Sequence, residues 1–135
     1  MINSVSFTEY VKRTFSFLIT EFKLELGEIT INGSAFYGVE YRDKLKGISI
    51  SIEPIGEYFQ VIVYKLDHGK MPDYDNKTKK IHLNELNKRV IKNLDKDEFN
   101  KNNQYFRDFE TRNKTERMIL KSAKDLRLVL SHYYD

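Results

Sequence analysis

Hydrophobic residues near the start of the chain recur three or four positions apart, as on one face of an α-helix. They are Phe7, Val11, Phe15, Leu18 and Phe22. Ser6 and Glu9 have the spacing of a capping box, in which the hydroxyl accepts from one backbone N–H and the carboxylate reaches back to the other. The pattern predicts one helix that is capped by Ser6 and stops before Gly27.

The hydrophobic period then changes to two, which is the period of half-buried β-strands. Asn32-Gly33 favours a type I′ hairpin turn. Isoleucines alternate with polar residues over 48–53. The segment 57–66 is apolar on both faces, as in a strand that is central or covered on both sides. The strands are expected at residues 28–31, 34–42, 48–53 and 57–66. Because the links between these four strands are short, the sequence predicts that they form a four-stranded antiparallel meander.

Residues 67–80 are polar, contain Gly, Pro and Asn, and are typical of a loop. Helical spacing returns after this loop, with leucines and valine from Leu83 to Leu94 and phenylalanines over 96–112. Asn113, three residues before Glu116, is typical of a helix N-cap. The order of elements predicts an α+β fold, in which two to three C-terminal helices pack on the sheet in two layers.

The length of 135 residues favours one domain, with a helix and sheet over 1–66, the loop over 67–80 and a helical part over 81–135. The chain has no cysteine, which excludes disulfides, thiol nucleophiles and cysteine-based metal sites. We find no signal peptide and no apolar run long enough to span a membrane, so we expect a cytoplasmic protein.

Little in the sequence points to catalysis. The glycines form no phosphate-binding loop and the serines no nucleophile motif, so we expect no cofactor and no enzyme activity. An alternative is an enzyme that uses Glu40 and Glu53, on neighbouring strands, or His68. His68 also lies near several aspartates, but the spacing matches no metal motif and we expect no metal site.

Aromatic residues are numerous, with nine phenylalanines and nine tyrosines. Tyrosine and phenylalanine are enriched at protein interfaces. If helices cover only one face of the sheet, the other face displays aromatic residues to a partner or to a second copy of the chain. The candidate partner-binding residues, on the sheet and in the loop, are Tyr37, Tyr41, Tyr58, Tyr64, His68, Asp73, Tyr74 and Asp75.

Nucleic-acid binding is the alternative to a protein partner. Basic residues concentrate in the segment 77–96, although the net charge of the chain is only +3. Such residues supply contacts to phosphates. The candidates are Lys77, Lys79, Lys80, Lys88, Arg89 and Lys92. The same residues also describe the solvated face of an ordinary amphipathic helix.

The first half of the chain resembles small uncharacterised bacterial α+β proteins, some of which are immunity partners of secreted toxins. The resemblance is carried by the aromatic stripe over 7–22 and by the strand segments 36–41, 48–53 and 58–66. It implies a non-enzymatic protein that binds a partner and neutralises it by steric occlusion. The slightly basic net charge of the chain does not match the acidic surfaces that nuclease inhibitors often use.

Overall fold

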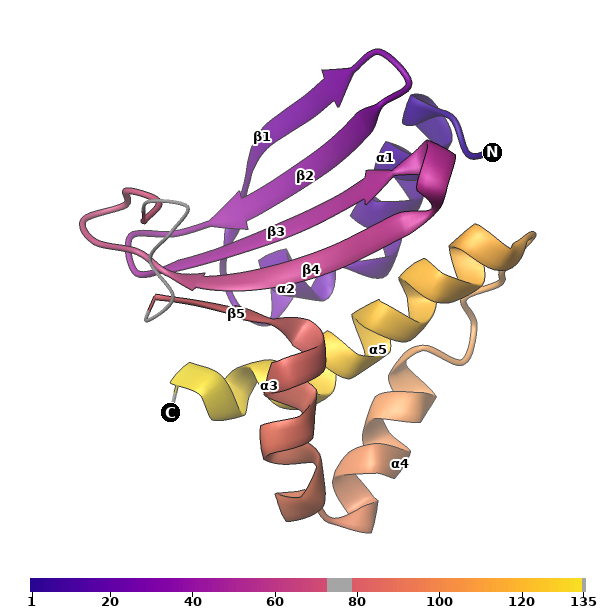
Figure 1. The fold of residues 1–135 in the computed structure, drawn as a ribbon. Coiled ribbons are helices and arrows are strands. Elements are labelled where there is room, and N and C mark those ends of the chain that lie inside the picture. Colours follow the sequence, from indigo (N-terminus) through magenta and orange to yellow (C-terminus); the bar gives the residue numbers. More distant parts are fainter. Residues whose placement is uncertain (73–78, 135) are drawn as a thin grey trace. The chain divides into compact units, whose positions relative to one another are not determined.

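The computed structural model describes residues 1–72 and 79–134. The fold is α+β, with N-terminal helices, an open antiparallel sheet and C-terminal helices (Figure 1). The chain divides into two compact units, Met1–His82 and Leu83–Asp135. The expected single domain and the expected two-layer packing of the C-terminal helices on the sheet stay predictions.

The N-terminal segment forms two helices, α1 (Ser4–Thr14) and α2 (Phe17–Thr20), so the prediction of one continuous helix is wrong. Phe15 and Phe17 are both fully buried, and their ring centroids lie 6.0 Å apart. Residues two positions apart point to different sides of a continuous helix. The break at Phe15 and Ser16 therefore allows both rings to be buried side by side.

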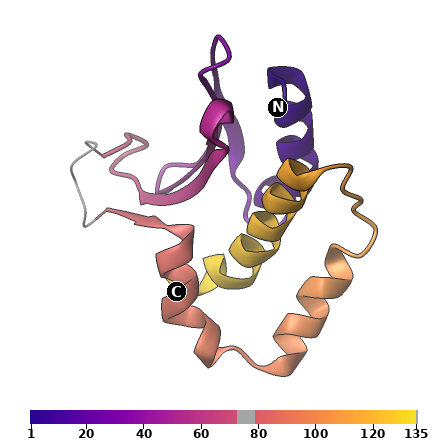
Figure 2. The same cartoon turned by 45° about the vertical axis from the view of Figure 1, so that its right-hand side comes forward.

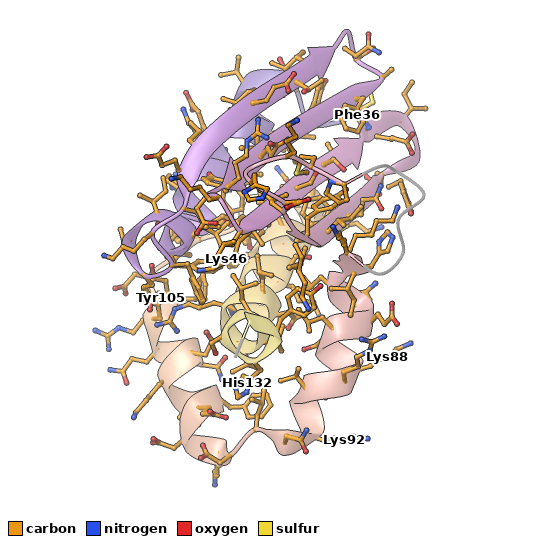
Figure 3. All side chains as sticks on the ribbon, turned by 90° about the vertical axis from the view of Figure 1, so that its left-hand side faces the viewer. Phe36, Lys46, Lys88, Lys92, Tyr105 and His132 are labelled. Carbon is orange, nitrogen blue, oxygen red and sulfur yellow. The ribbon has the colours of Figure 1, made fainter. Side chains whose placement is uncertain are left out.

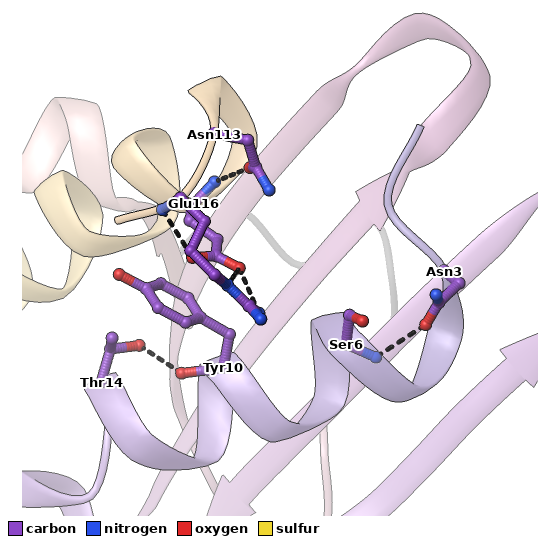
Figure 4. Close-up of polar contacts among 7 residues, drawn as sticks. Asn3, Ser6, Tyr10, Thr14, Asn113 and Glu116 are labelled. Atoms are coloured by element: carbon purple, nitrogen blue, oxygen red, sulfur yellow. Dashed lines mark hydrogen bonds and ion pairs between the residues drawn. The ribbon is translucent and has the colours of Figure 1, made fainter. Parts of the chain in front are cut away.

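The N-cap of α1 is Asn3, so the predicted cap at Ser6 is also wrong. The side chain of Asn3 accepts a hydrogen bond of 2.8 Å from the backbone N–H of Ser6 (Figure 4). Asparagine caps helices about as well as serine does. At the other end of α1, the buried Thr14 hydroxyl donates to the carbonyl of Tyr10 at 2.9 Å.

The sheet is an antiparallel meander in which each strand pairs with the next one in the sequence. The strands are β1 (Glu25–Asn32), β2 (Phe36–Arg42), β3 (Lys46–Glu53), β4 (Tyr58–Lys65) and β5 (Lys80–His82). The antiparallel meander is confirmed, but the sheet has five strands and the predicted four is wrong. A short 3₁₀ helix, η1 (Pro54–Gly56), joins β3 to β4.

One face of the sheet is apolar because the strand registers align the hydrophobic positions. Ile48, Ile50 and Ile52 of β3 lie opposite Tyr41, Val39 and Tyr37 of β2, and opposite Val63, Val61 and Phe59 of β4. Helices α1 and α2 lie on one side of the sheet (Figures 1 and 2). The ring of Phe7 in α1 lies 5.9 Å from the ring of Tyr37 and 6.5 Å from that of Phe59. The N-terminal helices therefore pack on this apolar face.

The second unit consists of α3 (Leu83–Val90), the 3₁₀ helix η2 (Ile91–Asn93), α4 (Lys96–Tyr105) and α5 (Lys114–Tyr134). Helix α5 packs against both α3 and α4 (Figure 2). Its predicted N-cap is confirmed, because Asn113 accepts from the backbone N–H of Glu116 at 2.9 Å (Figure 4). None of the helices in the described ranges is long and apolar enough to cross a membrane.

Candidate interaction surfaces

The second face of the sheet is opposite the helices α1 and α2, and we call it the open face. Its residues alternate with those of the apolar face along β2, β3 and β4. They are Phe36, Gly38, Glu40, Arg42, Gly47, Ser49, Ser51, Glu53, Tyr58, Gln60, Ile62 and Tyr64. The open face thus combines small and polar side chains and the buried Ile62 in its middle with aromatic side chains at its ends.

The ring of Phe36 lies across the backbone of β2 near one end of the open face, where Figure 3 labels it. A Cβ atom added at Gly38 would approach this ring to 3.0 Å, so the glycine leaves room for the ring to lie over the strand. Ser51 lies opposite Gly38 and is also buried. At the other end, Leu66 and Met71 approach Gly47 in the same way, each at 3.2 Å. At both ends of the open face, a glycine therefore allows a neighbouring side chain to lie directly over the strand backbone.

A tight turn at Asp67–Lys70 stands beside the same end of the sheet. His68 and Gly69 both have positive φ, as the central residues of a type I′ turn require, and Asp67 and Lys70 exchange two backbone hydrogen bonds. The backbone N–H of Gly69 donates to the carbonyl of Lys44 at 2.9 Å. This turn holds the fully exposed imidazole of His68 on a backbone that hydrogen bonds fix in place.

A hairpin does form at Asn32-Gly33, but the prediction that its turn is of type I′ is wrong. Asn32 pairs with Phe36, which leaves the three residues 33–35 in the loop. Only Gly33 has a positive φ in that loop. The turn with a positive φ at both central residues is instead the one at His68-Gly69, inside the segment 67–80 that the sequence predicts to be a loop.

The four candidate tyrosines of the sheet lie on opposite faces. Tyr37 and Tyr41 point to the apolar face and are only 4% and 1% exposed, so neither is available to a partner in this structure. Burial raises the pKa of Tyr41 to about 12. Tyr58 is 53% exposed and Tyr64 is half-buried, and both lie on the open face. The other candidates, Asp73, Tyr74 and Asp75, lie outside the described residues.

The candidate catalytic carboxylates do not come together. Glu40 pairs with Ser49, whereas Glu53 lies four residues further along β3, at about 13 Å for an extended strand. Instead, Glu40 Oε1 lies 3.1 Å from Arg42 Nε on the same strand. His68 lies 3.5 Å from Asp67 and is exposed. The described residues contain no cluster of three or more His, Asp or Glu side chains that would hold a metal ion.

The candidate nucleic-acid residues are divided between the two units. Lys79 and Lys80 lie near the C-terminal end of the first unit, which ends at His82. Lys88, Arg89 and Lys92 are exposed on α3 and η2 of the second unit (Figure 3 labels Lys88 and Lys92). Arg89 donates to Glu85 at 2.7 Å, which neutralises part of this charge. Lys77 lies outside the described residues.

The fold and these surfaces define the chain as an α+β protein with an open antiparallel sheet. No protein-family model, curated protein or solved structure matches it.

Proposed function

We propose that the chain is a non-enzymatic, cytoplasmic protein-interaction protein that binds a partner protein through the open face and the adjoining Asp67–Lys70 turn. The observation that carries the proposal is the difference between the faces of the sheet. The N-terminal helices pack on one face, while the other presents Phe36, Tyr58 and Tyr64 in exposed or half-buried positions.

The chemistry of this surface suits a protein partner. Exposed aromatic side chains supply much of the binding energy at protein interfaces, and arginine is enriched there as well. Between the aromatic ends, Ser49 and Gln60 are half-buried and offer polar groups to a partner, whereas Gly38, Gly47 and Ser51 are buried. The pair of Glu40 and Arg42 adds hydrogen-bonding groups of both signs.

Neutralisation of a toxin by steric occlusion is the form of the function that we favour. Occlusion requires only a surface that is complementary to the partner, and no reacting group. This requirement agrees with the scatter of Glu40, Glu53 and His68, which form no acid–base constellation. It also agrees with the resemblance of the first half of the chain to small bacterial proteins that include immunity proteins.

Site-specific photo-crosslinking tests this proposal. A photoreactive phenylalanine analogue replaces Tyr58 or His68, which stand at opposite ends of the proposed surface, in cells that naturally produce the protein. The matched control carries the same group at Tyr105, an exposed aromatic residue of α4. We expect both test positions to capture the same protein and the control to capture none of it.

The captured protein is then purified, and its own activity is titrated with the unmodified chain. Steric occlusion predicts stoichiometric loss of that activity, and Tyr58→Ala should weaken the inhibition. Equal capture at Tyr105, or capture of different proteins at Tyr58 and His68, would contradict the proposed surface. Adducts with nucleic acid in place of protein would favour the alternative function. In that case, charge reversal at Lys88 and Arg89 should abolish the adducts.

A further inference from the structure

The two edges of the sheet differ in how well they are protected from further strand pairing. Strand β5 is short, at three residues, and carries Lys80 and His82. Strand β1 has eight residues, contains neither lysine nor proline, and pairs only with β2 among the described strands. Natural proteins protect exposed edges with short strands, lysine, proline or bulges. By this criterion β5 is protected, whereas β1 carries only one register irregularity, between Leu26 and Ile29, and the rest of its edge has none of these features.

The side chains of β1 are unusually exposed for a strand with this composition. Leu26, Ile29 and Ile31 are 39%, 38% and 51% exposed, although they align with the apolar positions of β2. The one irregularity of the strand lies between Leu26 and Ile29. From Ile29 to Asn32 the register with β2 is regular, so this part of the edge is extended, and no described strand pairs with its outer side.

A second copy of this strand complements the edge. Antiparallel pairing about a two-fold axis at Thr30 places Ile29 opposite Ile31 of the other copy, and Ile31 opposite its Ile29. Thr30 then lies opposite Thr30. Continued into the irregular segment, this register places Glu28 beside Asn32, so no like charges face each other. Cross-strand pairs of β-branched residues and of threonines stabilise antiparallel sheets.

Other symmetric registers fit less well. An axis at Glu28 places the two Glu28 carboxylates directly opposite each other, which is unfavourable. An axis at Ile29 places Ile31 opposite Gly27 and Leu26 opposite Asn32, which leaves both apolar side chains without an apolar partner. Among these three registers, the charge and hydrophobic patterns of β1 favour the one about Thr30.

We propose that β1 pairs with β1 of a second copy of the chain, antiparallel about Thr30, to form one continuous sheet of ten strands. This interface uses the edge of the sheet and does not depend on the proposed function of the open face.

A cysteine scan tests both the pairing and its register, because the chain has no cysteine of its own. In the proposed dimer, Thr30→Cys places two thiols directly opposite each other, within reach of a disulfide after small adjustment. The matched control is Asn32→Cys, which is on the same exposed strand and the same face of the sheet. Its thiol lies opposite Glu28 of the other copy, four residues from the second thiol, at about 13 Å.

We expect the full-length Thr30→Cys protein to form a disulfide-linked dimer under mild oxidation at least about tenfold faster than Asn32→Cys, because pairing holds the thiols at a high effective concentration. The unmodified chain should sediment at twice the mass of one chain at high concentration, and Ile31→Lys should sediment as a monomer. Equal oxidation rates for the two cysteine variants would overturn the register. A monomeric unmodified chain, or dimerisation that Ile31→Lys leaves unchanged, would overturn the pairing.

Discussion

Replacing Tyr41 by phenylalanine removes one hydroxyl group and keeps the ring that fills the apolar face of the sheet. Tyr41 lies on β2, opposite Ile48 of β3, and only 1% of its surface is exposed. Its hydroxyl is therefore largely removed from water in the folded protein, and a phenolate there would lose most of its hydration. The substitution tests whether this burial controls the stability of the protein at alkaline pH.

The expected size of the effect follows from the pKa of Tyr41, which burial raises from 10.0 to about 12. Between these values the unfolded chain has released the proton while the folded protein still holds it. The folded state then binds more protons, so its stability falls as the pH rises from 10 to 12. At 1.36 kcal/mol for each pH unit, the loss is about 2 kcal/mol at pH 12, approaches about 3 kcal/mol at higher pH, and is absent well below pH 10.

Urea unfolding followed by circular dichroism at a series of pH values from 8 to about 12 measures this loss. We expect Tyr41→Phe to lose about 2 kcal/mol less than the unmodified chain between pH 8 and about 12. A residual decline should remain in the variant, because burial also raises the pKa of Tyr133, against the opposing effect of Arg89. Tyr58→Phe, which removes an exposed hydroxyl from the same sheet, is the control. Parallel alkaline declines in Tyr41→Phe and the unmodified chain would refute the reasoning.

Two further predictions concern single hydrogen-bonding side chains, and urea unfolding at neutral pH measures both. Asn3→Ala should lower the free energy of unfolding by about 1 kcal/mol, because it removes the cap of α1, whereas Ser6→Ala should cost clearly less. Equal losses would contradict the assignment of Asn3 as the cap. Asn102→Ala should cost about 1–3 kcal/mol, because this buried amide donates to the Lys124 carbonyl and accepts from Arg127. The control is Asn103→Ala, at the exposed neighbouring position. A comparable loss of stability in this control would show that the buried hydrogen bonds of Asn102 contribute little.

Individual strands of the sheet could be predicted from the sequence where hydrophobic and polar residues alternate over several positions. The isoleucines at 48, 50 and 52 indicate β3 without ambiguity, and the apolar run after Gly56 indicates β4. Strand β5 carries a single apolar residue, Ile81, between Lys80 and His82. Three residues are too few to show a period, so only the pairing with β4 reveals this strand.

The errors at the N-terminus arise because periodicity does not specify where a helix breaks or which cap it uses. Phe15 and Leu18 continue the helical stripe, and nothing in the spacing shows that Phe17 is buried as well. The placement of the tyrosines depends on the strand register, which the turns set. Val39 lies between Tyr37 and Tyr41 on the same face of β2 and was a signal that both point inward. By contrast, no pattern within the sequence shows that the Asp67–Lys70 turn is tied to Lys44.

The sequential meander has a consequence for the synthesis of the protein. Each strand of the first unit pairs with the strand that the ribosome makes next, and short turns of residues 33–35, 43–45 and 54–57 close the first three pairs. Short closures cost little chain entropy, and local pairing favours rapid folding. Strand β1 emerges first, and none of the described strands covers its outer edge. The proposed pairing of two copies would therefore be open to neighbouring nascent chains before their C-terminal helices are complete.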